Sequence, residues 1–442
     1  HHYSSSGNRE KAVKYLNLAG QQAIQRSAYA EAIAHLTNAL EMLRTLPDTA
    51  QRAQQELTLL IALGASLGPT KGFAAPELES VYTRARQLCQ QAGETPQLFS
   101  VLWGLWAFYT VRSESCEAAY GLSQQLLKMA QRVHDPDLLI VAHDALGNDL
   151  FGLGEFSRAR EHSEQSLALS DRRHHGSLAF LMGGEELEVV CRLRLAASLW
   201  CLGYPAQTLQ IMDEALTLAQ ALKSPFNMAF AHGYAAIHHQ WRGERNLARE
   251  RAEAAITLAV DHGFLFLLGS GYVLRGWALV KQGRVEEGIN QIREGMGRLA
   301  AIGIDMHRPY HLALLAEVHG IAGQIQEGLT ALDDALDLVN KTAVRYYEAE
   351  LHRIRGELVL TQNDLNAGQA KSCFQRAIEI ARSQRAKSWE LRATVSMARL
   401  LGKQGRHDEA CAMLSDIYGR FTEGFDTADL KEAKALLDEL SA

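Results

Sequence analysis

Proline and long hydrophobic runs are scarce in this chain of 442 residues, and its 45 basic residues are outnumbered by 51 acidic ones. The formal net charge of −6 leaves no broad basic surface, so we do not expect the chain to bind nucleic-acid phosphates. No apolar run approaches the roughly 20 residues that a membrane-spanning helix needs. The sequence therefore predicts neither a nucleic-acid partner nor a membrane partner.

Cysteine pairs and alternating polar and apolar stretches are missing as well. The six cysteines form no C-x-x-C pair, and their spacing gives no disulfide framework. This usage is typical of reduced thiols in a cytoplasmic protein. With only 8 prolines and no stretch that alternates long enough to form a sheet, the chain is expected to be all-α.

Small residues recur at a nearly constant distance along the chain. Successive gaps between the reference positions are 40, 49, 40, 40, 40, 40 and 42 residues, which marks a repeat array. The reference positions are Ala107, Gly147, Ala196, Ala236, Gly276, Ala316, Gly356 and Ala398.

Each repeat reads as a helical hairpin. A glycine follows most reference positions by seven residues, as at Gly243, Gly283 and Gly323, where the backbone must reverse. The second helix carries two small residues seven apart, as at Gly288 and Gly295, which lie on one face and let the helices approach closely. A HEAT-type repeat also has about 40 residues but does not require this pattern.

The sequence therefore predicts a tetratricopeptide-like α-solenoid, a right-handed superhelix of about ten hairpins with a period near 40. We expect one solenoid over residues 1–442. Its repeat is interrupted by an insertion at about 170–192, where the gap widens to 49, and a capping helix at about 427–440 closes its end.

Several segments resemble the C-terminal repeat region of a bacterial family of large multidomain proteins. They include RSAYAEAIAHLTNALEML, KGFAAPELESVYTRARQLC, TPQLFSVLWGLWAFY, LRGWALVKQG, RPYHLALLAEVHG and GFDTADLKEAKALLDEL. The family comprises predicted ATPases and class III adenylate/guanylate cyclases with tetratricopeptide repeats. The resemblance implies an upstream ATPase or cyclase domain, and because the chain begins His1-His2 without Met we expect it to be a fragment or a processed or tagged form.

The residues that catalysis would need are not found. A phosphate-binding loop ends in Lys followed by Ser or Thr, whereas Lys71 is followed by Gly72. His307 and His311 have helical spacing but lack the context of a zinc motif, so we interpret them as packed or surface histidines. We expect no catalytic site, no metal and no cofactor in this chain.

The first helices of tetratricopeptide hairpins line a concave groove, which is expected to hold a protein or peptide partner, including the chain's own upstream domains. The three tryptophans in this projection serve either as groove anchors or as core packing, because tryptophan does both. The projected groove residues are Arg112, Asp144, Asn148, Trp200, Gln240, Trp241, Trp277, Lys281, Glu317 and Arg353.

The insertion carries a basic patch of Arg172, Arg173, His174 and His175. It is either a solvated loop or a surface that docks an acidic partner. The function we expect is a non-catalytic interaction and regulatory region. The alternative is a sensor that binds a small effector molecule near the insertion.

Overall fold

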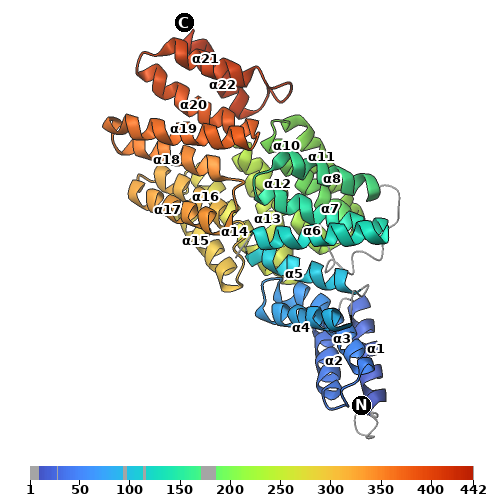
Figure 1. Cartoon of the computed structure of the whole chain (residues 1–442). Helices are drawn as coiled ribbons and strands as arrows, with labels where there is room; N and C mark the ends of the chain where they lie inside the picture. Colours follow the sequence, from blue (N-terminus) through green and yellow to red (C-terminus); the bar gives the residue numbers. More distant parts are fainter. Residues whose placement is uncertain (1–8, 27, 93–96, 113–115, 171–185, 442) are drawn as a thin grey trace.

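The fold is a stack of helical hairpins (Figure 1). The computed structural model describes residues 9–26, 28–92, 97–112, 116–170 and 186–441, and the regular elements in these ranges are all helices. The hairpins are α1 (Arg9–Gln25) with α2 (Tyr29–Leu43), α3 (Ala50–Lys71) with α4 (Pro76–Ala92), α5 (Leu98–Arg112) with α6 (Cys116–Val133), α7 (Pro136–Gly152) with α8 (Phe156–Ser170), α10 (Leu187–Cys201) with α11 (Pro205–Leu222), α12 (Pro225–Trp241) with α13 (Arg245–His262), α14 (Leu265–Lys281) with α15 (Val285–Ala301), α16 (Arg308–Ile321) with α17 (Ile325–Thr342), α18 (Glu348–Gln362) with α19 (Ala367–Ser383) and α20 (Lys387–Lys403) with α21 (His407–Tyr418). A 3-10 turn, η1 (Asp364–Asn366), precedes α19, and α22 (Ala428–Leu440) follows the last hairpin.

This order confirms an all-α, tetratricopeptide-like solenoid. The N-terminal hairpins project from one end of the molecule, and the C-terminal helices form the opposite end (Figure 1). None of the helices in the described ranges combines the length and the apolar character that crossing a bilayer requires.

Glycine makes the reversal within most hairpins. Gly243 has a φ of +72°, and it ends α12 by donating to Gln240 O while Glu244 N donates to His239 O. This pair of hydrogen bonds satisfies carbonyls that the helix end would otherwise leave unpaired. The same positive φ is found at Gly154, Gly203, Gly283, Gly323 and Gly405, as the sequence predicts.

Small residues bring the two helices of a hairpin into backbone contact. On α15, a Cβ added to Gly288 would lie 2.4 Å from the carbonyl oxygen of Gly276 on α14, and one added to Gly295 would lie 2.5 Å from that of Gly269. Only glycine allows this approach. The predicted role of the paired small positions is confirmed at this hairpin.

The coil closes on itself, which the repeat pattern did not predict. Arg345 N, before α18, donates to Gly152 O at the end of α7 (2.7 Å), and Ser388 Oγ on α20 donates to Trp200 O on α10 (2.5 Å). The carboxylate of Glu423 accepts hydrogen bonds from the backbone of Ala206 and Gln207 at the start of α11 (3.0 and 3.1 Å). Late hairpins therefore pack against the turns of middle hairpins.

Aromatic side chains fill the interior that this closure creates. Trp389 on α20 meets Trp241 edge to face, with ring centroids 5.7 Å apart, and meets Tyr347 at 5.3 Å. Tyr310 packs on Tyr347 at 4.9 Å. Rings as far apart in the chain as Phe156 and Trp389 thus share one core, and the chain itself covers much of the inner wall of the coil.

Candidate functional site

The structure separates the ten projected groove residues: five line one cleft, two lie in the aromatic core, and three lie elsewhere on the coil. Trp200 and Trp241 are each 2% exposed and lie in the aromatic core, so their assignment to an open groove was wrong. The cause is the closure of the coil, because Trp389 of α20 packs on the ring of Trp241 and Ser388 of α20 donates to the carbonyl oxygen of Trp200. For these two residues the core-packing alternative is the one that the structure supports.

Three more of these residues lie away from the cleft. Asp144 is buried and forms an ion pair with Arg194, while Cys191 Sγ donates to its Oδ1 (3.2 Å). The Nη1 of Arg112 donates to Ala74 O (3.3 Å), which holds it against the loop that leads into α4. Asn148 is half-buried on α7.

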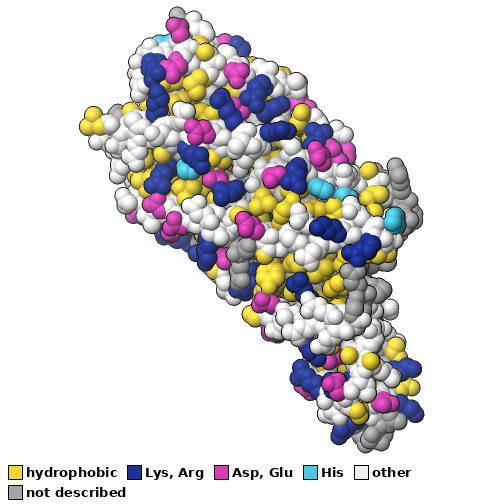
Figure 2. All heavy atoms as spheres, viewed as in Figure 1, with side chains coloured by type: hydrophobic (Ala, Val, Ile, Leu, Met, Phe, Trp, Pro, Cys, Tyr) yellow, Lys and Arg dark blue, Asp and Glu magenta, His cyan; other side chains and the backbone are white. Residues whose placement is uncertain are grey.

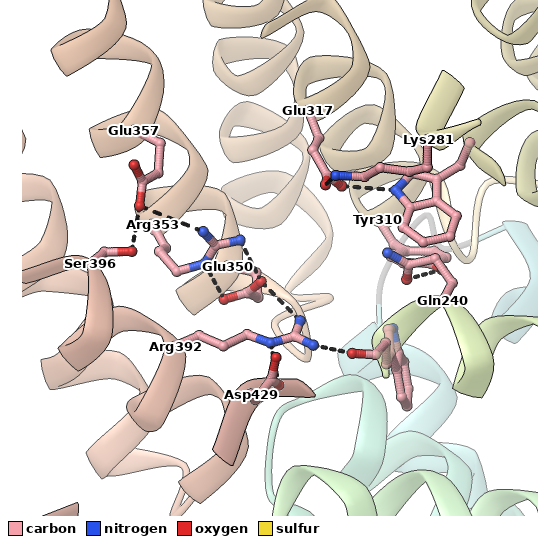
Figure 3. Close-up of polar contacts among 12 residues, drawn as sticks. Gln240, Lys281, Tyr310, Glu317, Glu350, Arg353, Glu357, Arg392, Ser396 and Asp429 are labelled. Atoms are coloured by element: carbon pink, nitrogen blue, oxygen red, sulfur yellow. Dashed lines mark hydrogen bonds and ion pairs between the residues drawn. The ribbon is translucent and has the colours of Figure 1, made fainter. Parts of the chain in front are cut away.

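The remaining five, Gln240, Trp277, Lys281, Glu317 and Arg353, line one cleft of about 350 Å³. Its walls come from the first helices of five consecutive hairpins, α12, α14, α16, α18 and α20, together with α22. Figure 3 labels four of them, Gln240, Lys281, Glu317 and Arg353, and marks their polar contacts with neighbouring side chains. First helices occupy the inner wall because their small residues pack against second helices on the outside.

Acidic and basic side chains alternate along the cleft. Lys281 Nζ lies 2.6 Å from a carboxylate oxygen of Glu317, whose other oxygen accepts a hydrogen bond from the indole of Trp277 (3.0 Å). Trp277 is only 3% exposed, so it contributes to the wall mainly by positioning Glu317. Lys281 also lies over the Trp277 ring, 5.8 Å from its centroid, at a distance that allows a cation–π contact.

Glu350 is the charged centre of the site. Arg353 donates to both of its carboxylate oxygens (2.7 and 2.9 Å), and Arg392 donates from α20 (3.3 Å) (Figure 3). Burial alone would raise the pKa of Glu350, but the two guanidinium groups outweigh it and hold this pKa below its usual value. Glu350 is therefore an ionised group that is 1% exposed.

Arg392 connects this cluster to distant parts of the chain. It forms an ion pair with Asp429 on α22 (2.8 Å) and donates to the carbonyl oxygen of Trp241 at the end of α12. Burial raises the pKa of Asp429, although Arg392 partly offsets the effect. One side chain thus joins the sixth hairpin, the last two hairpins and the capping helix.

The sequence reasoning missed Glu350, Arg392 and Asp429. One signal was available, because Glu350 and Glu390 are separated by one period of 40 residues and both lie near the start of a first helix. Glu390 is fully buried and accepts from Arg382 (2.7 Å) and Arg420 (3.0 Å). The shared register marks the two acids as equivalent positions of consecutive repeats, and in the structure both are buried and paired with arginines.

The two histidines with helical spacing, His307 and His311, are packed inside the protein. In the described ranges no group of three or more His, Cys, Asp or Glu side chains is arranged to hold a metal ion. The Nδ1 of His307 lies 3.0 Å from the hydroxyl of Tyr346. Burial lowers the pKa of His307 to about 4 and that of His311 to about 3, the latter also because His307 is adjacent. Both imidazoles are therefore neutral at pH 7.

The basic patch of the insertion, Arg172, Arg173, His174 and His175, lies outside the described residues. Residues 187–192, which we assigned to the insertion, belong to α10. Glu186 N donates to the side chain of Asn227 (3.0 Å), so the end of this segment lies beside the start of α12.

Comparisons with known proteins give a relative but no family. No family model matches the chain. An uncharacterised protein of Rhizobium meliloti (strain 1021) is 24% identical over 405 residues, which cover 90% of this chain. The chain spans only 38% of the length of that curated relative.

Among solved structures, the chain is similar to three proteins at low sequence identity. A Rap protein complexed with competence and sporulation factor has 12% identity and a TM-score of 0.47, over 98% of this chain and 99% of that one. For yeast Tom70 the values are 13% and 0.37, over 98% and 96% of the two chains. For human IFIT1 with PPP-AAAA they are 15% and 0.47, over 97% and 90%.

Proposed function

We propose that this chain is a non-catalytic regulatory region that binds a protein or peptide partner at the charged cleft. The observation that supports this is the convergence of Lys281, Glu317 and Arg353 on one cleft, all from inner helices and all partly exposed. Alternating charges at a concave surface select a partner by electrostatic complementarity more than by buried area. A segment with both acidic and basic side chains would match this lining.

The ionisation of the cleft supports binding rather than catalysis. A general base needs a pKa near the working pH, whereas the pKa of Glu350 is held below its ordinary value by Arg353 and Arg392. Glu317 is engaged by Lys281 and Trp277. These carboxylates act as fixed charges that orient arginine and lysine side chains.

The larger context is proposed from the resemblance of the sequence to repeat regions of bacterial ATPases and cyclases. The curated relative is longer than this chain, which leaves room for further domains in a protein of that kind. We propose a cytoplasmic signalling protein in which an upstream ATPase or cyclase domain is a partner of the cleft. No step of nucleotide chemistry is assigned to the residues of this chain.

The proposed mechanism is a change in the closure of the coil. Arg392 belongs to the cleft and also contacts the carbonyl of Trp241, so a partner that recruits Arg392 or Glu350 competes with a contact that closes the coil. Binding would then shift the equilibrium between closed and more open arrangements, to the extent that the partner prefers one of them.

Substitutions in the cleft test this proposal. Lys281→Ala and Arg399→Ala each remove a partly exposed cation from the lining, and Arg298→Ala removes a matched exposed cation of α15, outside the cleft. A partner is captured from native cell extract with the intact chain, identified, purified and titrated against each variant. We expect the cleft variants to bind about tenfold more weakly, equivalent to about 1.4 kcal/mol. The control should bind as the unsubstituted chain does, and equal binding by all three variants would exclude the cleft.

A further inference from the structure

A second, largely apolar pocket lies where the N-terminal hairpins meet the middle of the coil. Its volume is about 720 Å³, and its lining comes from the α3–α4 turn, α5, α10, the start of α12, the α13–α14 turn and the α15–α16 loop. In Figure 2, hydrophobic side chains gather in the middle of the visible face, over the region of α5. The pocket shares no residue with the charged cleft.

Aromatic rings dominate the lining. Nine of its residues are Phe, Tyr or Trp. In one group, Phe73 meets Trp103 edge to face at 6.0 Å. In the other, Phe226 meets Phe264 edge to face at 5.2 Å and stacks on Phe230 at 5.9 Å. Two sets of rings from different hairpins thus favour a ligand with a flat aromatic body.

The charged side chains of the lining are of one sign. Lys71 and Arg194 line the pocket, and none of its described lining residues is Asp or Glu. The carboxylates that pair with Lys71 and Arg194, those of Glu77 and Asp144, lie outside the lining. In a chain with a net charge of −6, this cationic lining favours an anion.

The backbone adds to this preference. The 17-residue helix α14 begins at the pocket, and Phe264 at its N-cap makes no side-chain capping hydrogen bond. The first N–H groups of a helix and the positive end of its dipole attract negative charge. The apolar rings, the cationic side chains and this helix end meet in the same cavity.

We infer that this pocket binds a small aromatic molecule that carries one anionic group. The volume lies within the range of roughly 300 to 1,000 Å³ that small-molecule sites have. One turn of an α-helix is about 10 Å across and 5.4 Å long and fills about 400 Å³, so the pocket would hold fewer than two turns of a partner helix. A compact ligand fits the space better than a peptide helix.

Such a ligand would join two parts of the coil. Asp305 and Met306, before α16, donate from their backbone to the carbonyl of Val111 at the end of α5 (3.0 and 3.2 Å). Val111 and Met306 both line the pocket. A molecule bound between them bridges the end of α5 and the loop before α16, so it acts as an effector of the coil rather than as a substrate.

Titration with a fluorescent aromatic anion tests this inference. The probe is anilinonaphthalene sulfonate, and its uncharged parent, phenylnaphthylamine, serves as the matched probe without the anionic group. We expect one sulfonate bound per chain, quenching of tryptophan emission because Trp103 and Trp106 line the pocket, and at least about tenfold weaker binding of the uncharged parent. Binding of both probes with equal affinity, or of several sulfonates per chain, would contradict the inference.

Substitutions locate the bound probe. Phe226→Ala removes a half-buried ring from the lining, and Lys71→Ala removes a cation whose ion pair with Glu77 is largely exposed. Each should weaken binding about tenfold, whereas Phe425→Ala, which removes an exposed ring distant from the pocket in the chain, should have no effect. Unchanged affinity in a Phe226→Ala protein with native circular dichroism would place the probe elsewhere and overturn the assignment.

Discussion

Two glycines of α15 should respond in opposite ways to the same substitution. A Cβ added to Gly288 would lie 2.4 Å from Gly276 O and 2.9 Å from Val280 N, whereas one added to the exposed Gly297 has no neighbour within 4 Å. Because carbon contacts are comfortable at about 3.5 Å or more, Gly288→Ala forces α14 and α15 apart by roughly 1 Å. The third close atom, Val280 Cγ2 at 2.5 Å, belongs to a side chain, but the other two belong to the backbone, so rotating Val280 alone cannot make room.

The magnitudes follow from two opposing effects. Alanine is favoured over glycine inside a helix by about 1 kcal/mol, which Gly297→Ala gains in full. Overpacking costs about 3 kcal/mol of stability where backbone must move. After the gain of about 1 kcal/mol from helix propensity is subtracted, Gly288→Ala should destabilise the hairpin by about 2 kcal/mol. The two variants should therefore differ by about 3 kcal/mol, more than a hundredfold in the equilibrium constant for local opening.

Hydrogen exchange on peptides from α14 and α15 is the appropriate assay, because a long repeat array does not unfold as one unit. Exchange in both helices should accelerate in Gly288→Ala and slow in Gly297→Ala, relative to the unsubstituted chain. If Gly288→Ala exchanges no faster than Gly297→Ala, the two helices are not in backbone contact, and the account of the paired small positions is wrong.

Three further outcomes are expected. Arg392→Ala leaves Glu350 without one of its buried partners and should lower the free energy of local opening of α18 and α20 by about 3 to 5 kcal/mol in hydrogen exchange, whereas the exposed Arg298→Ala should cost less than about 1 kcal/mol in α15. Burial lowers the pKa of His311 to about 3, so below pH 6.5 this imidazole binds a proton in the unfolded chain but not in the folded chain. The thermal stability advantage of the unsubstituted chain over His311→Asn should therefore shrink by about 1.4 kcal/mol per unit as the pH falls from 6.5 to 5, and a constant difference would show that this site is not buried. Glu423→Gln removes the negative charge at the start of α11 and should weaken that contact by about 1 kcal/mol. Amide exchange at the start of α11 should then accelerate about fivefold if the contact closes the coil in solution.

The sequence was sufficient for the local structure because each repeat depends on neighbouring residues. Turn glycines such as Gly243 need positive φ, and small residues such as Gly288 must face a partner helix. Both kinds of residue therefore recur in the sequence at the repeat period. The all-α, tetratricopeptide-like stack follows from this trace without any knowledge of long-range contacts.

The closure of the coil could not be predicted in the same way. It depends on contacts such as Ser388 with Trp200, which are 188 residues apart and leave no periodic pattern. Trp241 looked like a groove residue because its helix does line the inner wall, yet α20 covers it. The sequence therefore predicted some of the residues that line the candidate cleft, such as Lys281 and Glu317. Arg392 and Glu350 could be found only in the structure.

The hydrogen bonds between the Glu423 carboxylate and the start of α11 have a consequence for biosynthesis. Its acceptor atoms and the backbone of Ala206 are 217 residues apart in the chain. At about 5 to 20 residues per second, a ribosome needs roughly 10 to 40 seconds to make that length. Trp241 likewise lacks the ring of Trp389 that packs on it in the folded chain until α20 has been made, so we expect the nascent middle hairpins to expose apolar surface in that interval.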